Sequence, residues 1–389
     1  LTDAWPTDCS GPVFLTTFTF DPAWFEHCLL PQLADRGAFP IVVFVDEAMG
    51  VTPNIQTFSA LMLAGRAWSV VPVRHAGAFH PKVHLFPRQN TALVGSGNLT
   101  WSGCGGNVEA FDRLDPNQGT AIRGVRAFFG DLVRDARSIL SSEDRTLWTS
   151  VLEAAPEPEE GGDAAFLHNL GKPLQDQLTP HLQNRIFTEA RFCAPFHSPD
   201  HAQSRSLWAT LGHPELEVAA DAAPEGADPA WKTGNLVGLP KRPLHAKLIH
   251  ARSADSALLV CGSANLTSAA WTTGNIEAVV VRTGDANTFD DFIQEQPFQP
   301  GAWALPTWTS DLQNHPDMAE VTEADWARLA GGEFHVAAPP APHPAFALWV
   351  GTERHNLTLS WDDDAQIWRG ECPVDEREIQ RVATVTVEV

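Results

Sequence analysis

Basic residues, cysteines and long apolar runs are all scarce in this sequence, and each shortage excludes a class of protein. Lysine and arginine total 26 against 48 acidic residues, a formal net charge of −22. This charge counts against a non-specific DNA coat protein but not against an enzyme whose cleft alone is basic. The richest apolar stretches, such as Ile41–Val45 and Ala278–Val281, have the length of strands and fall short of the ~18–20 residues that cross a bilayer. We expect no integral membrane association.

The six cysteines are scattered along the chain, and none belongs to a CxxC pair. This spacing argues against a zinc ribbon and favours reduced thiols in a cytoplasmic protein, with a secreted protein holding one or two disulfides as the alternative. Leu1–Ser10 lacks the basic start and apolar stretch of a signal peptide. The sequence stops within an alternation of valine and threonine, which leaves open that more protein follows Val389 in the natural chain.

The most informative feature that is present is an internal repeat of three short blocks. Each block is found twice, in the same order and at nearly the same spacing, and the histidines that open the two copies are at positions 80 and 245. Gene duplication explains this recurrence better than chance. The blocks are His-Pro-Lys at 80–82, Gly-Ser-Gly-Asn-Leu-Thr at 95–100 and Asn-Val-Glu-Ala at 107–110, and then His-Ala-Lys at 245–247, Gly-Ser-Ala-Asn-Leu-Thr at 262–267 and Asn-Ile-Glu-Ala at 275–278.

The sequences before the blocks repeat more loosely and predict the fold. In the first half the pattern is strand, helix, strand, and the second half repeats it. We predict an α/β protein of two similar halves, each with a mixed β-sheet flanked by helices, related by a pseudo-two-fold axis. The predicted elements are Val13–Phe20, Ala23–Leu33 and Ile41–Asp46 in the first half, and Arg185–Phe192, His201–Leu211 and Leu216–Asp221 in the second.

Two breaks divide the chain. Glu153–Asp163 is rich in Glu, Pro and Gly and is typical of a solvated linker, and Val336–Pro344 is rich in proline. We predict a first half at 1–152, a second half at 164–330 and a small β-rich C-terminal region at 340–389. The predicted strands of that last region are Phe346–Val350, Leu357–Trp361 and Ala383–Val389.

The repeated His-x-Lys pair supplies two of the groups that metal-free cleavage of a phosphodiester needs. The reaction takes a nucleophile for phosphorus, an acid for the leaving oxygen and cations for the non-bridging oxygens. On a strand, residues i and i+2 point to the same side, so His80 lies beside Lys82 and His245 beside Lys247. One copy supplies half of a site, and two facing copies complete it.

These blocks resemble the signature of the phospholipase D superfamily, in which His-x-Lys is followed after four residues by Asp, then by Gly-Ser-x-Asn and a downstream Glu. The resemblance spans residues 10–300. It implies a phosphodiesterase that needs no metal or other cofactor and that forms a covalent phosphohistidine. By the same resemblance, His80 is the nucleophile, and His245 protonates the leaving group and then activates water.

The resemblance implies roles for the other repeated residues as well. Glu109 and Glu277 would each accept a hydrogen bond from an imidazole and so fix its tautomer. The remaining residues would contact the phosphate. The lysines and asparagines would bind the phosphate oxygens, and the serines would add contacts through their hydroxyl groups. These residues are Lys82, Lys247, Asn98, Asn265, Ser96 and Ser263.

One position departs from the signature in both copies. Pro87 and Arg252 stand where the motif has its Asp. Tyrosyl-DNA phosphodiesterases of the same superfamily also lack this Asp and remain enzymes, whereas lipid-type phospholipases D keep it. The departure therefore favours a nucleic-acid substrate over a lipid.

Other candidates flank the repeated blocks. Trp101 and Trp271 follow the two Gly-Ser loops and would either stack on a base at the rim of the cleft or pack beneath the loop. Lys241 and Arg242 would touch substrate phosphates or form an ordinary exposed pair. His84 shares a strand face with the first pair, and we expect it to be a supporting or packed side chain, with a metal ligand as the alternative.

The sequence therefore predicts a nuclease acting on DNA or RNA. The family resemblance extends to the nuclease components of bacterial restriction or phage-defence systems, which implies further domains or partner proteins of such a system. Two alternatives remain: a phospholipase D or transphosphatidylase that acts on lipid, and a non-catalytic nucleic-acid-binding module with a degenerate site.

Overall fold

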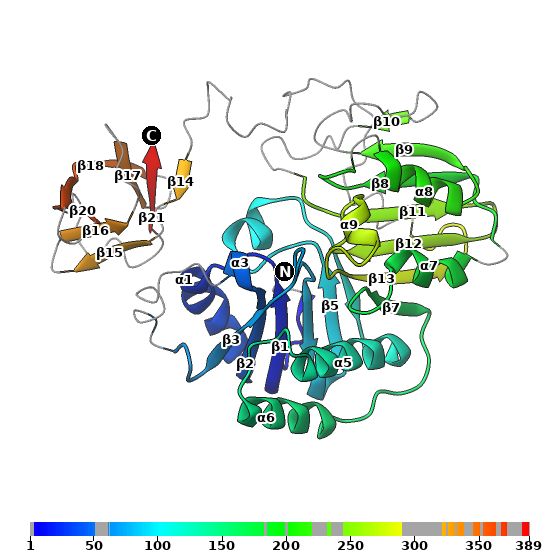
Figure 1. Cartoon of the computed structure of the whole chain (residues 1–389), viewed down its shortest axis with the longest axis horizontal. Helices are drawn as coiled ribbons and strands as arrows, with labels where there is room; N and C mark the ends of the chain where they lie inside the picture. Colours follow the sequence, from blue (N-terminus) through cyan, green and yellow to red (C-terminus); the bar gives the residue numbers. More distant parts are fainter. Residues whose placement is uncertain are drawn as a thin grey trace. The chain divides into compact units, whose positions relative to one another are not determined.

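The computed structural model describes residues 4–50, 61, 63–182, 185–198, 201–219, 232–234 and 244–289, and in the C-terminal part 321–323, 326–330, 333–337, 345–350, 353–362, 367–371 and 383–388. The chain divides into two compact units, Leu1–Pro306 and Thr307–Val389. The first unit contains both copies of the repeat and consists of two lobes, each built on one β-sheet (Figure 1).

The sheet of the first lobe has six strands in the order β3-β2-β1-β4-β5-β6. The first three run parallel to one another, and the hairpins that follow are antiparallel. The strands are β1 (Gly11–Thr17), β2 (Ala38–Asp46), β3 (Trp68–Val73), β4 (Val83–Phe86), β5 (Thr91–Gly95) and β6 (Phe111–Leu114).

The sheet of the second lobe repeats this order and adds one strand. Its order is β10-β9-β8-β11-β12-β13-β7. Its first six strands, β10, β9, β8, β11, β12 and β13, correspond in that order to β3, β2, β1, β4, β5 and β6, with the same parallel and antiparallel pairings. The predicted pair of mixed sheets is confirmed. The strands are β7 (Ala164–His168), β8 (Glu189–Cys193), β9 (Glu215–Ala219), β10 (Lys232–Gly234), β11 (Leu248–Arg252), β12 (Ala257–Gly262) and β13 (Ala278–Gly284).

Helices cover the sheets. One helical stretch from Pro22 to Ala34 packs on one face of the first sheet, where its leucines and Phe25 meet the inward side chains of β1 and β2. Its start is capped by Asp21, whose carboxylate accepts from the Trp24 N–H at 2.9 Å. The helices of the first lobe are α1 (Pro22–Trp24), η2 (Phe25–Leu29), α2 (Leu30–Ala34), α3 (Glu47–Gly50), η3 (Pro87–Gln89), η4 (Ser102–Gly106), α5 (Gly119–Arg134) and α6 (Ser142–Glu153).

The second lobe is covered in the corresponding way. Leucines of α7 and α8 pack with α9 and with the inward side chains of β8, β9, β11 and β12. The helix and strands that the sequence predicted for this half appear with shifted ends, as α8 and as strands β8 and β9. The helices are α7 (Leu174–Leu182), α8 (Ala202–Thr210) and α9 (Ser268–Trp271).

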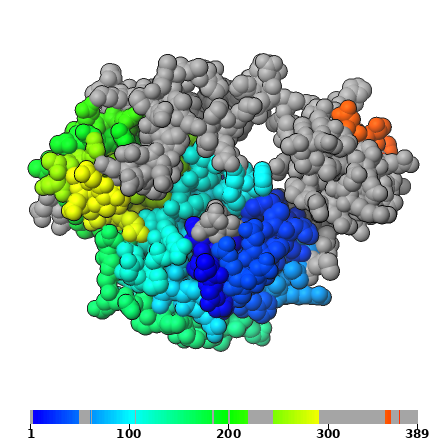
Figure 2. Space-filling model, turned by 180° about the vertical axis from the view of Figure 1, so that it is seen from behind, coloured from blue at the N-terminus to red at the C-terminus, as the bar shows by residue number. Residues whose placement is uncertain are grey.

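One hydrophobic cluster spans the two lobes. Helix α5 of the first lobe buries Ile122, Val125 and Phe129 on its own sheet, and the same cluster continues into β7 and β13 of the second lobe. Strands β12 and β13 also contact β5 and β6. Figure 2 shows residues near 250–289, in yellow and yellow-green, directly against the cyan surface of the first lobe.

The described residues of the second unit form two four-stranded antiparallel sheets, β14-β21-β17-β18 and β15-β16-β20-β19. Its strands begin at Val321, ahead of the 340 boundary expected from the prolines. Leu357–Trp361, expected to be one strand, spans the end of β18 and the start of β19. The strands are β14 (Val321–Glu323), β15 (Trp326–Ala330), β16 (Glu333–Ala337), β17 (Ala345–Val350), β18 (Glu353–Leu357), β19 (Ser360–Asp362), β20 (Ile367–Glu371) and β21 (Ala383–Glu388).

Among the described residues, no helix combines the length and the apolar character required to cross a membrane.

Candidate active site

Both His-x-Lys pairs lie in segments without regular secondary structure that lead directly into a strand. His80 and Lys82 precede β4, and His245 and Lys247 precede β11, so the pairs stand just outside the strands in which the sequence placed them. Thr16 anchors the first segment. Its hydroxyl donates to the Pro81 carbonyl at 2.9 Å and accepts from the Val83 N–H.

Backbone hydrogen bonds join each histidine segment to the other lobe. The His80 N–H donates to the Ile276 carbonyl at 2.8 Å, and the His245 N–H donates to the Val108 carbonyl at 2.9 Å. The adjacent residues form isolated parallel bridges, Phe79 with Ile276 and Val108 with Leu244. Because the glutamates follow Val108 and Ile276 directly, these bridges carry each glutamate to the histidine of the opposite lobe.

The histidine–glutamate pairs are accordingly crossed between the lobes. His80 Nδ1 lies 2.8 Å from Glu277 Oε2, and His245 Nδ1 lies 2.7 and 2.9 Å from the two oxygens of Glu109. Because Nδ1–H donates to a carboxylate, the lone pair of each neutral imidazole is on Nε2, where it can act as a nucleophile or a base. The charge of each lysine also lowers the pKa of the imidazole in the other half, Lys247 that of His80 and Lys82 that of His245. The four residues therefore belong to one site.

The serines that we expected to contact substrate hold the glutamates instead. Ser263 Oγ donates to Glu277 Oε2 and Ser96 Oγ donates to Glu109 Oε2, each at 2.5 Å, and both serines are fully buried. This arrangement corrects their assignment as substrate-binding residues, because the single hydroxyl proton of each is already used.

Two asparagines with no role predicted from the sequence complete the support. Asn275 Nδ2 donates to Glu277 Oε1 and Asn107 Nδ2 donates to Glu109 Oε1, each at 3.2 Å. They open the third repeated block, two residues before each glutamate, so their recurrence was the signal that pointed to them.

The two lysines are almost completely buried. Lys82 Nζ donates to the His80 carbonyl at 2.6 Å, and Lys247 Nζ donates to the His245 carbonyl, so both ammonium groups are folded back toward the histidines. Burial lowers the pKa of Lys247 to about 8 and moves the pKa of Lys82 well below its ordinary value. An anionic phosphate placed beside them would favour their charged forms.

Burial also sets the protonation of the histidines. It lowers the pKa of His80 to about 4, against the opposite effect of Glu277, and it lowers the pKa of His245 as well. For Glu277, burial alone would raise the pKa, but the charges and hydrogen bonds of the surrounding site together hold it below its ordinary value, and the same is true of Glu109. The site at neutral pH therefore combines neutral imidazoles with ionised glutamates.

The two motif asparagines are held differently. Asn98 Oδ1 accepts from the Phe18 N–H at 3.2 Å, so its NH₂ group remains as the donor available to a ligand. Asn265 Oδ1 is buried and, within the part of the chain that the structure describes, has no hydrogen-bond partner.

The flanking candidates separate into exposed and buried residues. Trp101 is 68% exposed, whereas Trp271 is 1% exposed and packs in the core of the second lobe. A stacking role for Trp271 is therefore corrected to core packing. Lys241 and Arg242 lie outside the described residues.

His84 is a buried supporting residue. It is fully buried and accepts a hydrogen bond on Nδ1 from Trp5 Nε1 at 3.2 Å, with the Phe111 ring beside it. Among the described residues, no cluster of three or more His, Cys, Asp or Glu side chains has the arrangement of a metal site.

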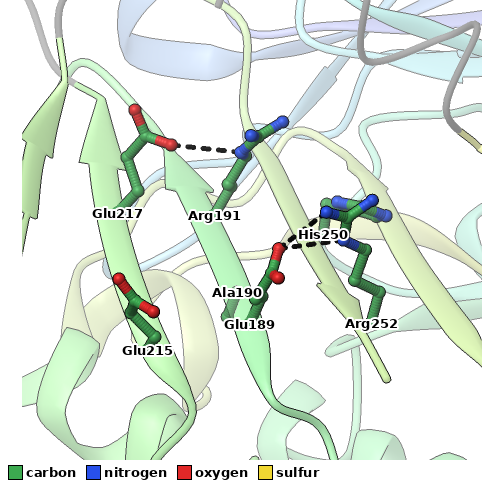
Figure 3. A pocket seen from close by; sticks show the side chains of 7 residues that line it. All are labelled: Glu189, Ala190, Arg191, Glu215, Glu217, His250 and Arg252. Carbon is green, nitrogen blue, oxygen red and sulfur yellow. Dashed lines mark hydrogen bonds and ion pairs between the residues drawn. The ribbon is translucent and has the colours of Figure 1, made fainter. Parts of the chain in front are cut away.

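The residues at the two positions where the motif has Asp do not contribute to the site. Pro87 starts η3 and its carbonyl accepts from Arg126 at 2.7 Å. Arg252 pairs with Glu189 across β11 and β8, and together they line a separate hollow on the sheet face of the second lobe, where Arg191 also pairs with Glu217 (Figure 3). None of the repeated residues lines this hollow.

No protein-family model matches the sequence, and no curated protein matches it either. Solved structures are similar at low identity. Phosphatidylserine synthase of Haemophilus influenzae is 11% identical with a TM-score of 0.49 over 74% of this chain and 80% of that one. Yeast tyrosyl-DNA phosphodiesterase is 11% identical with a TM-score of 0.47 over 73% and 85%.

A third structure matches part of the chain. The phospholipase D family member Nuc from Salmonella typhimurium is 17% identical with a TM-score of 0.27, and the match covers 36% of this chain and 97% of Nuc. Two lobes of matching topology, with a full set of motif residues from each converging on one site, form the arrangement that the repeat implied. The chain therefore folds into two equivalent lobes, and each lobe carries one copy of the duplicated motif.

Proposed function

We propose that this protein is a metal-independent phosphodiesterase that cleaves a nucleic-acid strand, DNA or RNA, through a covalent phosphohistidine on His80. The observation that supports this most is the crossed pairing of His80 with Glu277 and of His245 with Glu109. It gives two imidazoles with a fixed tautomer and places two lysines beside them, which are the groups that such a reaction requires.

The proposed reaction has two steps. First, the Nε2 lone pair of His80 forms a bond to phosphorus, the bond from phosphorus to the leaving oxygen breaks, and that oxygen takes a proton from Nε2 of protonated His245. Second, a water oxygen attacks phosphorus while its proton passes to His245 Nε2, and the bond between phosphorus and His80 breaks. Lys82, Lys247 and the amide of Asn98 neutralise or bind the non-bridging oxygens throughout.

Nucleic acid is the substrate we favour because of the site's surroundings. Trp101 stands largely exposed three residues after Asn98, where its ring is available to stack on an unpaired base. The motif Asp that lipid-type members keep is replaced by Pro87 and Arg252. The compact halves suit the nuclease component of a bacterial restriction or phage-defence system, which is the setting we propose.

The first experiment finds the substrate. Wild-type protein is incubated in EDTA at low ionic strength with single- and double-stranded DNA and RNA and with phosphatidylcholine vesicles. We expect cleavage of a nucleic acid and none of the lipid. Release of choline would move the proposal to the lipid enzymes, and activity that is lost in EDTA and restored by Mg²⁺ would contradict the metal-free mechanism.

The second experiment separates the two histidines on a substrate with an activated leaving group, such as a p-nitrophenyl ester of a nucleotide. His80→Ala should form no covalent adduct. His245→Ala should still be attacked, because this leaving group needs no proton, and should accumulate an acid-labile, base-stable adduct because the base that activates water is missing. His213→Asn, which changes an exposed histidine outside the site, is the control and should match wild type.

A further inference from the structure

The two half-sites differ at one position beside the histidines. The isolated bridges Phe20–Leu99 and His197–Leu266 are equivalent, because Leu99 and Leu266 each follow the motif asparagine. Counting back two residues from each bridge places Phe18 in the first lobe and Pro195 in the second at the same point of the fold.

Phe18 contacts three groups of its half-site. Its ring lies edge-to-face with the His80 imidazole at a centroid distance of 5.0 Å and 61°. The Lys82 ammonium lies 5.7 Å from the same ring. Its backbone N–H donates to Asn98 Oδ1 at 3.2 Å. One residue therefore covers the imidazole, contacts the cation and orients the amide.

In the described part of the second lobe, these contacts have no counterpart. Pro195 has neither an aromatic ring nor an N–H, and the preceding Ala194 lacks the hydroxyl that Thr17 carries in the first lobe. The buried Oδ1 of Asn265 is accordingly left without a hydrogen bond among the described residues.

Solvent exposure follows the same division. The His80 side chain is 10% exposed and its partner Glu277 is completely buried, whereas the His245 side chain is 19% exposed and Glu109 is 7% exposed. The charged groups that act on His80 are Glu277, Lys82 and Lys247, and those that act on His245 are Glu109, Lys247 and Lys82. The two charge sets are alike, so among the described residues the apolar ring of Phe18 distinguishes the environment of His80 from that of His245.

We propose that Phe18 is a positioning residue that makes the two half-sites unequal, excluding water from His80 and Lys82 and thereby assigning attack to His80 and proton transfer to His245. The division of labour rests on the proposed function, whereas the unequal basicity of the two imidazoles does not. A drier imidazole stays neutral and keeps its Nε2 lone pair, and a wetter one is protonated more readily and serves as the acid.

The test is a titration of the full chain labelled with ¹⁵N-histidine, followed by NMR, with His80 and His245 assigned from single substitutions. In wild type the pKa of His80 should be the lower of the two. Phe18→Ala should raise the His80 pKa by about one unit, because water then reaches the ring, and should leave His245 unchanged. Phe18→Tyr, which keeps the ring, should restore the wild-type value, and Pro195→Ala, the matched change in the other lobe, should alter neither.

If Phe18→Ala does not fold, Phe18→Leu keeps the backbone N–H and much of the volume while removing the ring. Equal titration of the two histidines in wild type, or an unchanged His80 pKa in the folded Phe18 variant, overturns the inference without any substrate. In the second arm, peptide mapping should find the phosphoryl adduct only on His80 in wild type and on both histidines in the Phe18 variant. An adduct confined to His80 in both wild type and the Phe18 variant refutes the assignment of roles. No adduct at all in wild type refutes the proposed function, and the titration still decides which of the two histidines has the lower pKa.

Discussion

At the scale of single residues, each imidazole is the centre of a chain of oriented groups. A serine hydroxyl and an asparagine amide hold a glutamate, the glutamate accepts from Nδ1–H, and Nε2 is left as the reacting atom. Because both oxygens of the carboxylate accept hydrogen bonds, the carboxylate cannot rotate away without breaking one of them. The tautomer is therefore set before any substrate arrives.

The crossed pairs predict different defects for the two glutamates. Glu277→Gln should slow formation of the adduct on every substrate by on the order of 10²–10⁴-fold, because the positive charge that develops on His80 loses its counter-ion. Glu109→Gln should impair the acid, so its defect should shrink when the leaving group is p-nitrophenolate. Single-turnover rates on a normal and an activated ester distinguish the two, and equal defects on both esters for both variants would contradict the crossed assignment.

The histidine pKa values predict an acidic optimum. His80 must be neutral to attack, and burial lowers its pKa to about 4, so activity should rise as the pH passes upward through that value. His245 must carry a proton, and its pKa lies below the ordinary 6.5, so kcat/KM should fall as the pH rises through that lowered value. The profile should be a bell between these limits, and its alkaline limb should disappear with an activated leaving group.

The sequence identified the repeated histidines, lysines and glutamates that meet in the site, but not how they are paired and not the supporting Asn107, Asn275 and Phe18. A repeat names the same His80, His245, Glu109 and Glu277 whether the pairs form within a lobe or across lobes, because residue types and spacings are identical in both cases. The backbone bridges that decide it join residues such as Phe79 and Ile276, which are distant in sequence. The role of the serines was missed because the sequence does not show whether a hydroxyl in a Gly-Ser turn contacts a ligand or a glutamate of the protein.

At the scale of elements, Asp46 connects a strand end to the first histidine segment. One carboxylate oxygen accepts from the N–H groups of Ala48 and Met49 at the start of α3, at 2.9 and 3.1 Å, and the other accepts from the Phe79 N–H at 2.8 Å. The sequence showed an acid at the end of a buried strand but not its partner, which lies 33 residues further along.

This contact gives an element-scale prediction. Asp46→Ala should reduce the free energy of unfolding by about 1–3 kcal/mol, because three backbone donors lose their acceptor. Asp46→Asn keeps one oxygen for α3 but can turn its NH₂ group toward Phe79, so it should cost less stability and still lower kcat. Urea unfolding and steady-state kinetics on the two variants test this, and full activity in Asp46→Asn would show that the Phe79 bond does not position His80.

A strand could be predicted from the sequence where all its side chains are buried and the apolar run is therefore continuous. The continuous apolar run at Ile41–Asp46 and the helical pattern before it appear as β2 and the α1-η2-α2 stretch. Strand β7 was not foreseen, because Ala164–His168 has no equivalent among the described strands of the first lobe and is placed by pairing with β13. Its phenylalanine completes a core formed largely by the other lobe, a long-range effect that no local pattern carries.

At the scale of the whole molecule, one buried ion pair links the lobes. Arg282 on β13 makes a two-pronged contact with Asp112 on β6, with N–O distances of 2.8–3.1 Å, and also donates to the Arg113 carbonyl. The side chains of Arg282 and Asp112 are 17% and 7% exposed. Burial raises the pKa of the Asp112 carboxyl, and the neighbouring guanidinium opposes that rise.

Breaking this pair should destabilise both lobes together. Arg282→Ala leaves Asp112 buried without its counter-ion, and the free energy of unfolding should fall by about 3–5 kcal/mol. Arg134→Ala removes an exposed pair with Asp131 on α5 and, as the control, should change it by less than about 1 kcal/mol. Separate unfolding transitions for the lobes in wild type would contradict a shared core.

The exchange of glutamates between lobes has a consequence for concentration. Neither lobe alone contains a histidine together with the carboxylate that orients it, so separate lobes would work only as an associated pair whose amount falls with dilution. Fusion in one chain makes the encounter intramolecular, and the complete site is present in every folded molecule at a fixed ratio of one to one. The turnover per molecule should therefore hold constant down to the most dilute solution in which the protein remains folded.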